Sequence, residues 1–157
     1  MKPLVVGLGN DLLADDAVGI LVARELACRA DGRFDVIECS LSGLSLLDVL
    51  VGYDRSVIID AIRTEKVPVG TIIEVDPQLL RSTANPSPHY AGLPEVIKLA
   101  DQLRVDFPKE IRIFAMEVAD SHTIGGGLSE PVAGALGQLV GRVSACLDRW
   151  ESEGSAV

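Results

Sequence analysis

Two neighbouring carboxylates follow the first glycine-rich turn of the chain. Residues 7–19 read GLGNDLLADDAVG, and the apolar run at residues 4–6 before them predicts a buried strand. Leu12 stands where a dinucleotide-binding fingerprint requires its third glycine, and Asp15 and Asp16 would repel a pyrophosphate. The turn therefore places two carboxylates at the carboxyl edge of a sheet, where α/β folds bind ligands. The alternative is that one aspartate caps the following helix and the other is solvated.

A third carboxylate and a histidine are further candidates. Asp60 ends the apolar run Val57–Ile59, so we expect it at the same edge. A carboxylate placed there needs a partner, because desolvating a lone charge is costly. The alternative is a helix cap or an ion pair with Arg63. His89 lies in a Pro/Gly-rich turn before a predicted helix and can fold over the edge, although histidines in such loops are more often surface residues.

Asp16, Asp60 and His89 would form a metal site if the fold brings them together. Two carboxylates and one imidazole suit a borderline ion such as nickel or zinc better than calcium, which prefers more oxygen ligands. They would also leave coordination positions open for water or a substrate group. A serine nucleophile is a poorer hypothesis, because the G-x-S-x-G motif is absent and the pair Ser121-His122 has no evident third partner.

The segment 115–129 leaves the last predicted strand at the same edge. Its triple glycine, residues 125–127, cannot hold one shape without contacts, so it could form a moving rim. The alternative is an ordinary loop.

Alternating strands and helices predict a parallel sheet with helices on both faces. The predicted strands are 4–6, 34–39, 56–61, 71–75 and 110–114, and the predicted helices are 17–30, 44–51, 93–103 and 131–150. Only about ten residues separate the third and fourth strands, too few for a parallel crossover, so the fourth strand should run antiparallel. Three glycines of the last helix, Gly134, Gly137 and Gly141, could allow close packing on the sheet. We expect one domain over residues 1–150 and a frayed tail over 151–157.

The composition excludes several classes of partner. A net charge of −9 opposes binding to nucleic acid and to anionic membrane surfaces. No run approaches the roughly 18 apolar residues of a membrane span, and the apolar start of the chain is too short for a signal peptide. Three scattered cysteines are typical of reduced thiols in a cytoplasmic protein.

Taken in order, these motifs resemble the hydrogenase maturation endopeptidases. The stretches that carry the resemblance are GLGNDLLADDAVG, SLSGLSLLDVLVGYDRSVIIDAI, SPHYAGL, FAMEVAD and GGGLSEPV. The resemblance implies a three-layer α/β/α sandwich on a five-stranded mixed sheet, of the phosphorylase/hydrolase-like kind. It also implies that the family's metal ligands and catalytic residues correspond to Asp16, Asp60 and His89.

The function implied by the resemblance is narrow. It is a nickel-dependent endopeptidase that removes the C-terminal extension of the [NiFe] hydrogenase large-subunit precursor after nickel insertion. Nickel would arrive with the substrate, and zinc or cadmium could replace it in crystals. Its role would be either to mark a loaded precursor, which we favour, or to polarise the scissile carbonyl as well. We expect a cytoplasmic monomer whose partner is the precursor.

Two other functions compete with this one. A metal-sensing maturation chaperone would use the same three residues without cutting the precursor. A peptidyl-tRNA hydrolase-like enzyme also carries GLGN after its first strand, but it needs a basic face that a net charge of −9 opposes.

Overall fold

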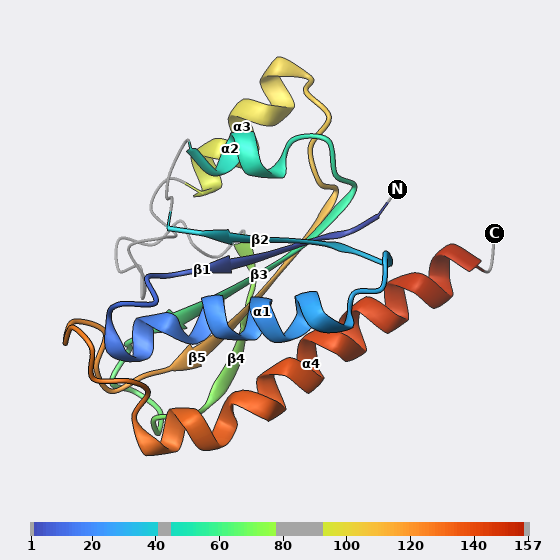
Figure 1. The fold of residues 1–157 in the computed structure, drawn as a ribbon. Helices are drawn as coiled ribbons and strands as arrows, with labels where there is room; N and C mark the ends of the chain where they lie inside the picture. The colour runs from blue at the N-terminus through green and yellow to red at the C-terminus, as the bar shows by residue number, and fades with distance from the viewer. Residues whose placement is uncertain (1, 41–44, 78–92, 156–157) are drawn as a thin grey trace.

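The computed structural model describes residues 2–40, 45–77 and 93–155, which form a sheet with helices on both faces (Figure 1). The strands are β1 (Leu4–Leu8), β2 (Asp35–Cys39), β3 (Arg55–Ile62), β4 (Ile72–Val75) and β5 (Glu110–Glu117). The helices are the 3-10 turn η1 (Ala14–Ala17), α1 (Val18–Arg29), α2 (Ser45–Leu50), α3 (Leu93–Leu103) and α4 (Glu130–Ser155). None of the helices within these ranges is both long and apolar enough to cross a lipid bilayer.

The sheet has five strands in the order β2-β1-β3-β5-β4. β1 pairs in parallel with β2 and β3, and β3 pairs in parallel with β5. β4 runs antiparallel to β5, with Ile72 opposite Met116. The predicted antiparallel fourth strand is therefore confirmed, as is the predicted mixed sheet. Because β1, β3 and β5 are parallel, the turns that follow them meet at one carboxyl edge.

Two apolar layers hold the helices to the sheet. Val57 and Ile59 of β3 face the layer under α1 and α4, together with side chains such as Val22 and Leu139. Ile58 and Ile62 of β3 face the other layer, under α2 and α3, together with Leu4, Leu46 and Leu50. Side chains alternate along a strand, so Asp60, two residues after Ile58, lies on the α2–α3 face.

Two glycines set how closely α1 approaches the sheet. A Cβ atom on Gly7 of β1 would lie 2.3 Å from the carbonyl oxygen of Gly19 in α1. A Cβ atom on Gly19 would lie 2.2 Å from the oxygen of Leu8 and 2.4 Å from that of Ile59. The first turn of α1 therefore rests directly on the backbones of β1 and β3. This contact brings the turn that carries Asp15 and Asp16 beside the end of β3.

The start of α1 differs from its prediction. Asp15 and Asp16 lie in η1, Ala17 is the N-cap of α1, and no side chain caps either helix. The alternative that one aspartate caps the helix is therefore wrong, because each carboxylate accepts hydrogen bonds elsewhere, as described below.

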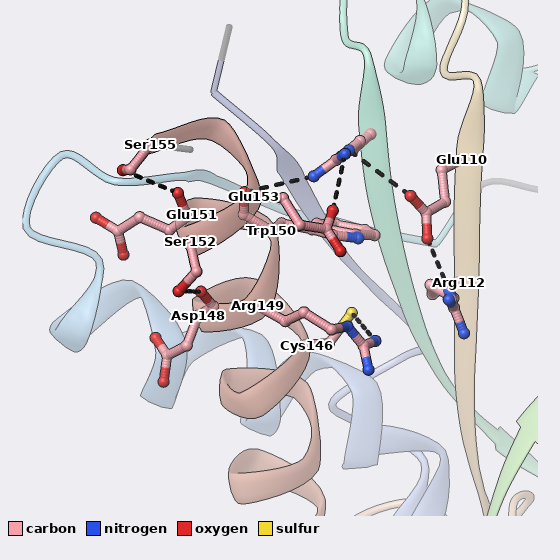
Figure 2. A network of polar contacts seen from close by, with 11 residues as sticks. Glu110, Arg112, Cys146, Asp148, Arg149, Trp150, Glu151, Ser152, Glu153 and Ser155 are labelled. Carbon is pink, nitrogen blue, oxygen red and sulfur yellow. Dashed lines mark hydrogen bonds and ion pairs between the residues drawn. The ribbon is translucent and has the colours of Figure 1, made fainter. Parts of the chain in front are cut away.

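The end of α4 also differs, since the helix continues through Ser155 and includes residues expected to be a frayed tail. Arg33 pairs with Glu151 at 3.2 Å, and Arg55 pairs with Glu153 at 3.0 Å. Arg55 also pairs with Glu110 at 3.6 Å, so one arginine of β3 joins β5 to the last turns of α4. Its two partners, Glu110 on β5 and Glu153 on α4, are labelled in Figure 2. The guanidinium of Arg55 lies 5.5 Å from the centre of the Trp150 ring. These contacts come from distant parts of the chain and extend the helix.

The glycines of α4 do not pack on the sheet, so that prediction is wrong. A Cβ atom on Gly134, Gly137 or Gly141 would meet no atom within 4 Å, which places these glycines toward open space.

Alanine substitutions in the two helices should therefore act in opposite directions. Gly19→Ala should lower the free energy of unfolding by about 1–3 kcal/mol or more, because its methyl group would meet two backbone oxygens. Gly137→Ala should raise the free energy of unfolding by about 0.5–1 kcal/mol, because alanine favours a helix where space is free. Urea unfolding of both variants measures this, and a Gly19→Ala protein as stable as wild type would contradict the close approach.

Candidate functional site

A pocket of about 300 Å³ opens at the carboxyl edge of the sheet. It lies between the turn after β1 and the segments that follow β3 and β5. Its lining combines apolar, hydrogen-bonding and charged side chains: Asn10, Leu13, Asp16, Ser40, Ala61, Ile62, Arg63, Val118, Ser121 and His122. A pocket therefore lies at the edge where the sequence predicts a site, and Asp16 is one of its lining residues.

A larger cavity of about 530 Å³ lies near the opposite edge, lined by Phe34, Arg55 and Trp150 among others. Its arginines already pair with carboxylates: Arg55 pairs with Glu110 and Glu153, as described above. The contacts of this cavity therefore hold α4 to the sheet, and the smaller pocket at the carboxyl edge is the better candidate for chemistry.

Asp16 lines the pocket and is held by the turn around it. Its Oδ2 accepts the N–H of Asn10 at 2.8 Å, and its own N–H donates to the oxygen of Leu13 at 2.8 Å. Gly9 makes this turn possible, because its φ is +140° and a Cβ atom there would lie 2.1 Å from the oxygen of Asp16. The glycine after β1 therefore lets the backbone of Asp16 press against the strand end.

Asp60 is fully buried near the end of β3. Its Oδ1 accepts the N–H of Ala61 at 2.8 Å, and Ala61 and Ile62 line the pocket. Arg63, the ion-pair partner considered from sequence, forms a salt bridge with Glu65 at 3.3 Å. The structure thus brings Asp60 to the same edge as Asp16, behind the pocket wall.

His89 lies outside the described residues, so the predicted group of three ligands stays a prediction. Across residues 2–40, 45–77 and 93–155, no three His, Cys, Asp or Glu side chains are arranged to hold a metal ion.

Asp15 has a role that the sequence did not suggest. It is fully buried, and its carboxylate accepts four hydrogen bonds from the segment between β5 and α4. The donors are the backbone N–H groups of Ala119 and Asp120, each at 3.1 Å, and of Ser129 at 2.7 Å, with the Ser129 hydroxyl at 2.9 Å. The Asp15 N–H in turn donates to the oxygen of Asp120 at 2.8 Å. Asp15 is therefore neither a cap nor solvated; it joins the two loops that border the pocket.

The loop expected to form a moving rim is held by further contacts. The Asp120 carboxylate accepts the N–H groups of His122 at 2.9 Å and Thr123 at 3.0 Å. The Thr123 hydroxyl, followed by these two N–H groups, lowers the pKa of Asp120 to about 2. Leu13 forms a β-bridge with Ile124, and the Gly125 N–H donates to the oxygen of Leu12 at 3.0 Å. The triple glycine thus lies in a loop that is anchored at both ends and at its tip.

A second buried carboxylate, that of Glu117, anchors the connection between β3 and β4. It is 1 % exposed and accepts the Thr64 N–H at 2.8 Å, the Thr64 hydroxyl, and the Glu65 N–H at 3.4 Å. Glu117 and Asp60 show the same sequence signal, an acid after buried apolar strand residues. The signal alone therefore does not separate a structural anchor from a ligand candidate.

Comparison with known proteins identifies the family. The hydrogenase maturation protease family matches residues 20–145 of the chain. The hydrogenase 2 maturation protease of Escherichia coli K12 is 32% identical over 72% of this chain and 71% of its own length. The chain belongs to the hydrogenase maturation protease family. The HupD hydrogenase expression/formation protein of Bradyrhizobium diazoefficiens is 28% identical over 94% of this chain and 78% of its own. The solved structure of the hydrogenase maturating endopeptidase HybD from E. coli superposes with a TM-score of 0.79 at 29% identity, covering 95% of this chain and 93% of that one.

The protease is therefore an endopeptidase with the α/β fold of its family, as predicted from the motifs. Its site contains more than the sequence revealed. Asn10 and Ser40 line the pocket, yet neither was a candidate, and Ser121 and His122, considered only as a poor nucleophile pair, line it as well. The only available signal was position in the chain. Ser40 directly follows β2, and Asn10 follows Gly9, the first residue after β1.

Replacing Asp15 tests the junction between the two loops. Asp15→Asn should lower the free energy of unfolding by about 2–3 kcal/mol, because an amide cannot accept from all of these buried donors. Asp16→Asn is the matched control: its carboxylate is only partly buried, and we expect a loss of less than about 1 kcal/mol. Denaturant unfolding compares the two variants, and equal losses would show that Asp15 has no special structural role.

Proposed function

We propose that this protease removes the C-terminal extension of the [NiFe] hydrogenase large-subunit precursor, and does so after nickel has been inserted. The support is its family, together with relatives that are named hydrogenase maturation proteases. Family membership also favours cleavage over the alternative of a chaperone that only senses metal. We place this reaction in the cytoplasm and expect the protease to act as a monomer.

The proposed nickel ligands are Asp16, Asp60 and His89, which would also be the catalytic residues. The observation that supports the set most directly is the pocket at the carboxyl edge, where Asp16 lines one wall and the residues after Asp60 line another. His89 precedes α3 by four residues in the sequence. Because α3 leads back to the start of the parallel strand β5, it begins toward the carboxyl edge, and α3 covers the face on which Asp60 lies.

The donor types fit nickel carried by the substrate. Two carboxylates and one imidazole are borderline ligands and do not form a closed shell, so the remaining positions are filled by groups of the precursor or by water. Zinc or cadmium could occupy the same ligands in crystals.

Nickel in this arrangement can act in two ways. It can dock the loaded precursor by joining it to Asp16, Asp60 and His89, or it can also polarise the scissile carbonyl and lower the pKa of a bound water. We favour docking as the first role. A protease that obtains its metal from the substrate stays inactive on an unloaded precursor. Cleavage then occurs only after nickel insertion is complete.

Nickel loading of the precursor should decide whether it is cut. The purified protease is incubated with nickel-loaded and with metal-free precursor, and the mass of the large subunit is followed. We expect shortening of the loaded precursor only, because the metal completes the docking site. Equal rates on both forms would remove the nickel requirement.

Substitution of the proposed ligands should abolish cleavage of the loaded precursor. Asp16→Asn, Asp60→Asn and His89→Ala each remove one donor, and mass spectrometry should detect no shortened product. Asp31→Asn is the matched control: Asp31 is exposed, lies after α1 at the other edge, and has a φ of 45° that asparagine tolerates. Circular dichroism checks that each variant is folded, and full activity of a folded His89→Ala protein would exclude His89 from the site.

A further inference from the structure

One border of the pocket is a short ribbon of two chain segments. Leu13 forms an antiparallel β-bridge with Ile124, and the next pair is joined by the hydrogen bond from the Gly125 N–H to the Leu12 oxygen. Residues directly opposite each other in an antiparallel pair point to the same face. Ile124 therefore shares a face with Leu13, which lines the pocket, and it lies two residues after His122, another lining residue.

Ile124 is the most exposed large apolar side chain among the described residues, at 79%. The segment around it, residues 121–129, contains no acidic residue, lysine or arginine, although the whole chain carries a net charge of −9. An exposed isoleucine on an uncharged segment does not gain the free energy that burial gives, and a contact with another molecule would supply that gain. Its place at the mouth of the pocket suggests that the compensating contact comes from the substrate.

We propose that Ile124 and Leu13 form a binding surface for an apolar side chain of the precursor, next to the peptide bond that is cut. This inference rests on the proposed function, since its occupant is the substrate of that reaction. A pocket of about 300 Å³ is small even among pockets for single ligands, so it holds the residues at the cut but not their neighbours. An extended chain advances about 3.3 Å per residue, so a neighbouring residue of the precursor lies over the rim.

The rim is held ready for this contact. The Asp15 carboxylate fixes both ends of the segment that carries Ile124, and the Asp120 carboxylate fixes the turn before it. Little conformational entropy is then lost when the precursor binds, because the surface is already ordered. An uncharged, apolar surface also selects an apolar side chain over a charged one, which would be desolvated without a partner.

The test compares substitutions at Ile124 with a matched control far from the pocket. Leu103, the last residue of α3, is 58% exposed and precedes β5 on the side away from the carboxyl edge. With nickel-loaded precursor as substrate, Ile124→Ser should raise KM about ten-fold, which equals about 1.4 kcal/mol of lost binding, while kcat changes little. Ile124→Leu should restore KM to near the wild-type value, and Leu103→Ser should leave KM and kcat unchanged.

The other outcomes each overturn a specific statement. An unchanged KM in both Ile124→Ser and Ile124→Asp, with intact circular dichroism, would overturn the binding surface while the proposed function stands. A wild-type dimer that Ile124→Ser converts to a monomer, again with unchanged KM, would assign the surface to a second copy of the chain. If the wild-type protease leaves the nickel-loaded precursor uncut, the proposed function fails first, before any variant is compared, and this inference fails with it.

Discussion

The geometry of the candidate site depends on one buried carboxylate. Asp15 takes no part in the pocket lining, yet it joins the turn after β1 to the segment between β5 and α4. A buried carboxylate without partners would cost several kcal/mol, and here four donors offset that cost. Because the donors lie at both ends of one loop, the same contact fixes one border of the pocket relative to another.

The sheet supplies the second constraint on the site. Parallel strands bring the turns after β1, β3 and β5 to one edge, and the close approach of Gly7 to Gly19 holds α1 against the backbone there. Asp16 and Asp60 belong to different segments, but neither can move far without displacing a strand. Preorganisation of this kind benefits a docking site, because ligands that are already placed lose little entropy when the substrate arrives.

Much of this arrangement could be predicted from the sequence, for reasons that are local. The length of the connection between β3 and β4 determined that β4 is antiparallel, and apolar runs that end in Asp60 or in a glycine turn marked the carboxyl edge. Long-range contacts could not be predicted. The Asp15 donors lie 104 to 114 residues away, and the last turns of α4 depend on Arg33 and Arg55. Periodicity and capping rules describe neighbours in the chain, so they offered only a helix cap or a solvated side chain as the alternative role of Asp15, and they ended α4 too early.

The neighbouring residues Asp15 and Asp16 have different roles: the Asp15 carboxylate anchors a distant loop, and Asp16 lines the pocket. A 3-10 turn has about three residues per turn, so successive side chains point roughly a third of a circle apart. In η1 this directs Asp15 into the protein and leaves Asp16 at the pocket. The oxygens of Asp15 are saturated by donors from a distant loop, and the backbone they immobilise is the one that carries Asp16. The short turn η1 therefore lets a buried anchor and a candidate ligand occupy consecutive positions in the chain.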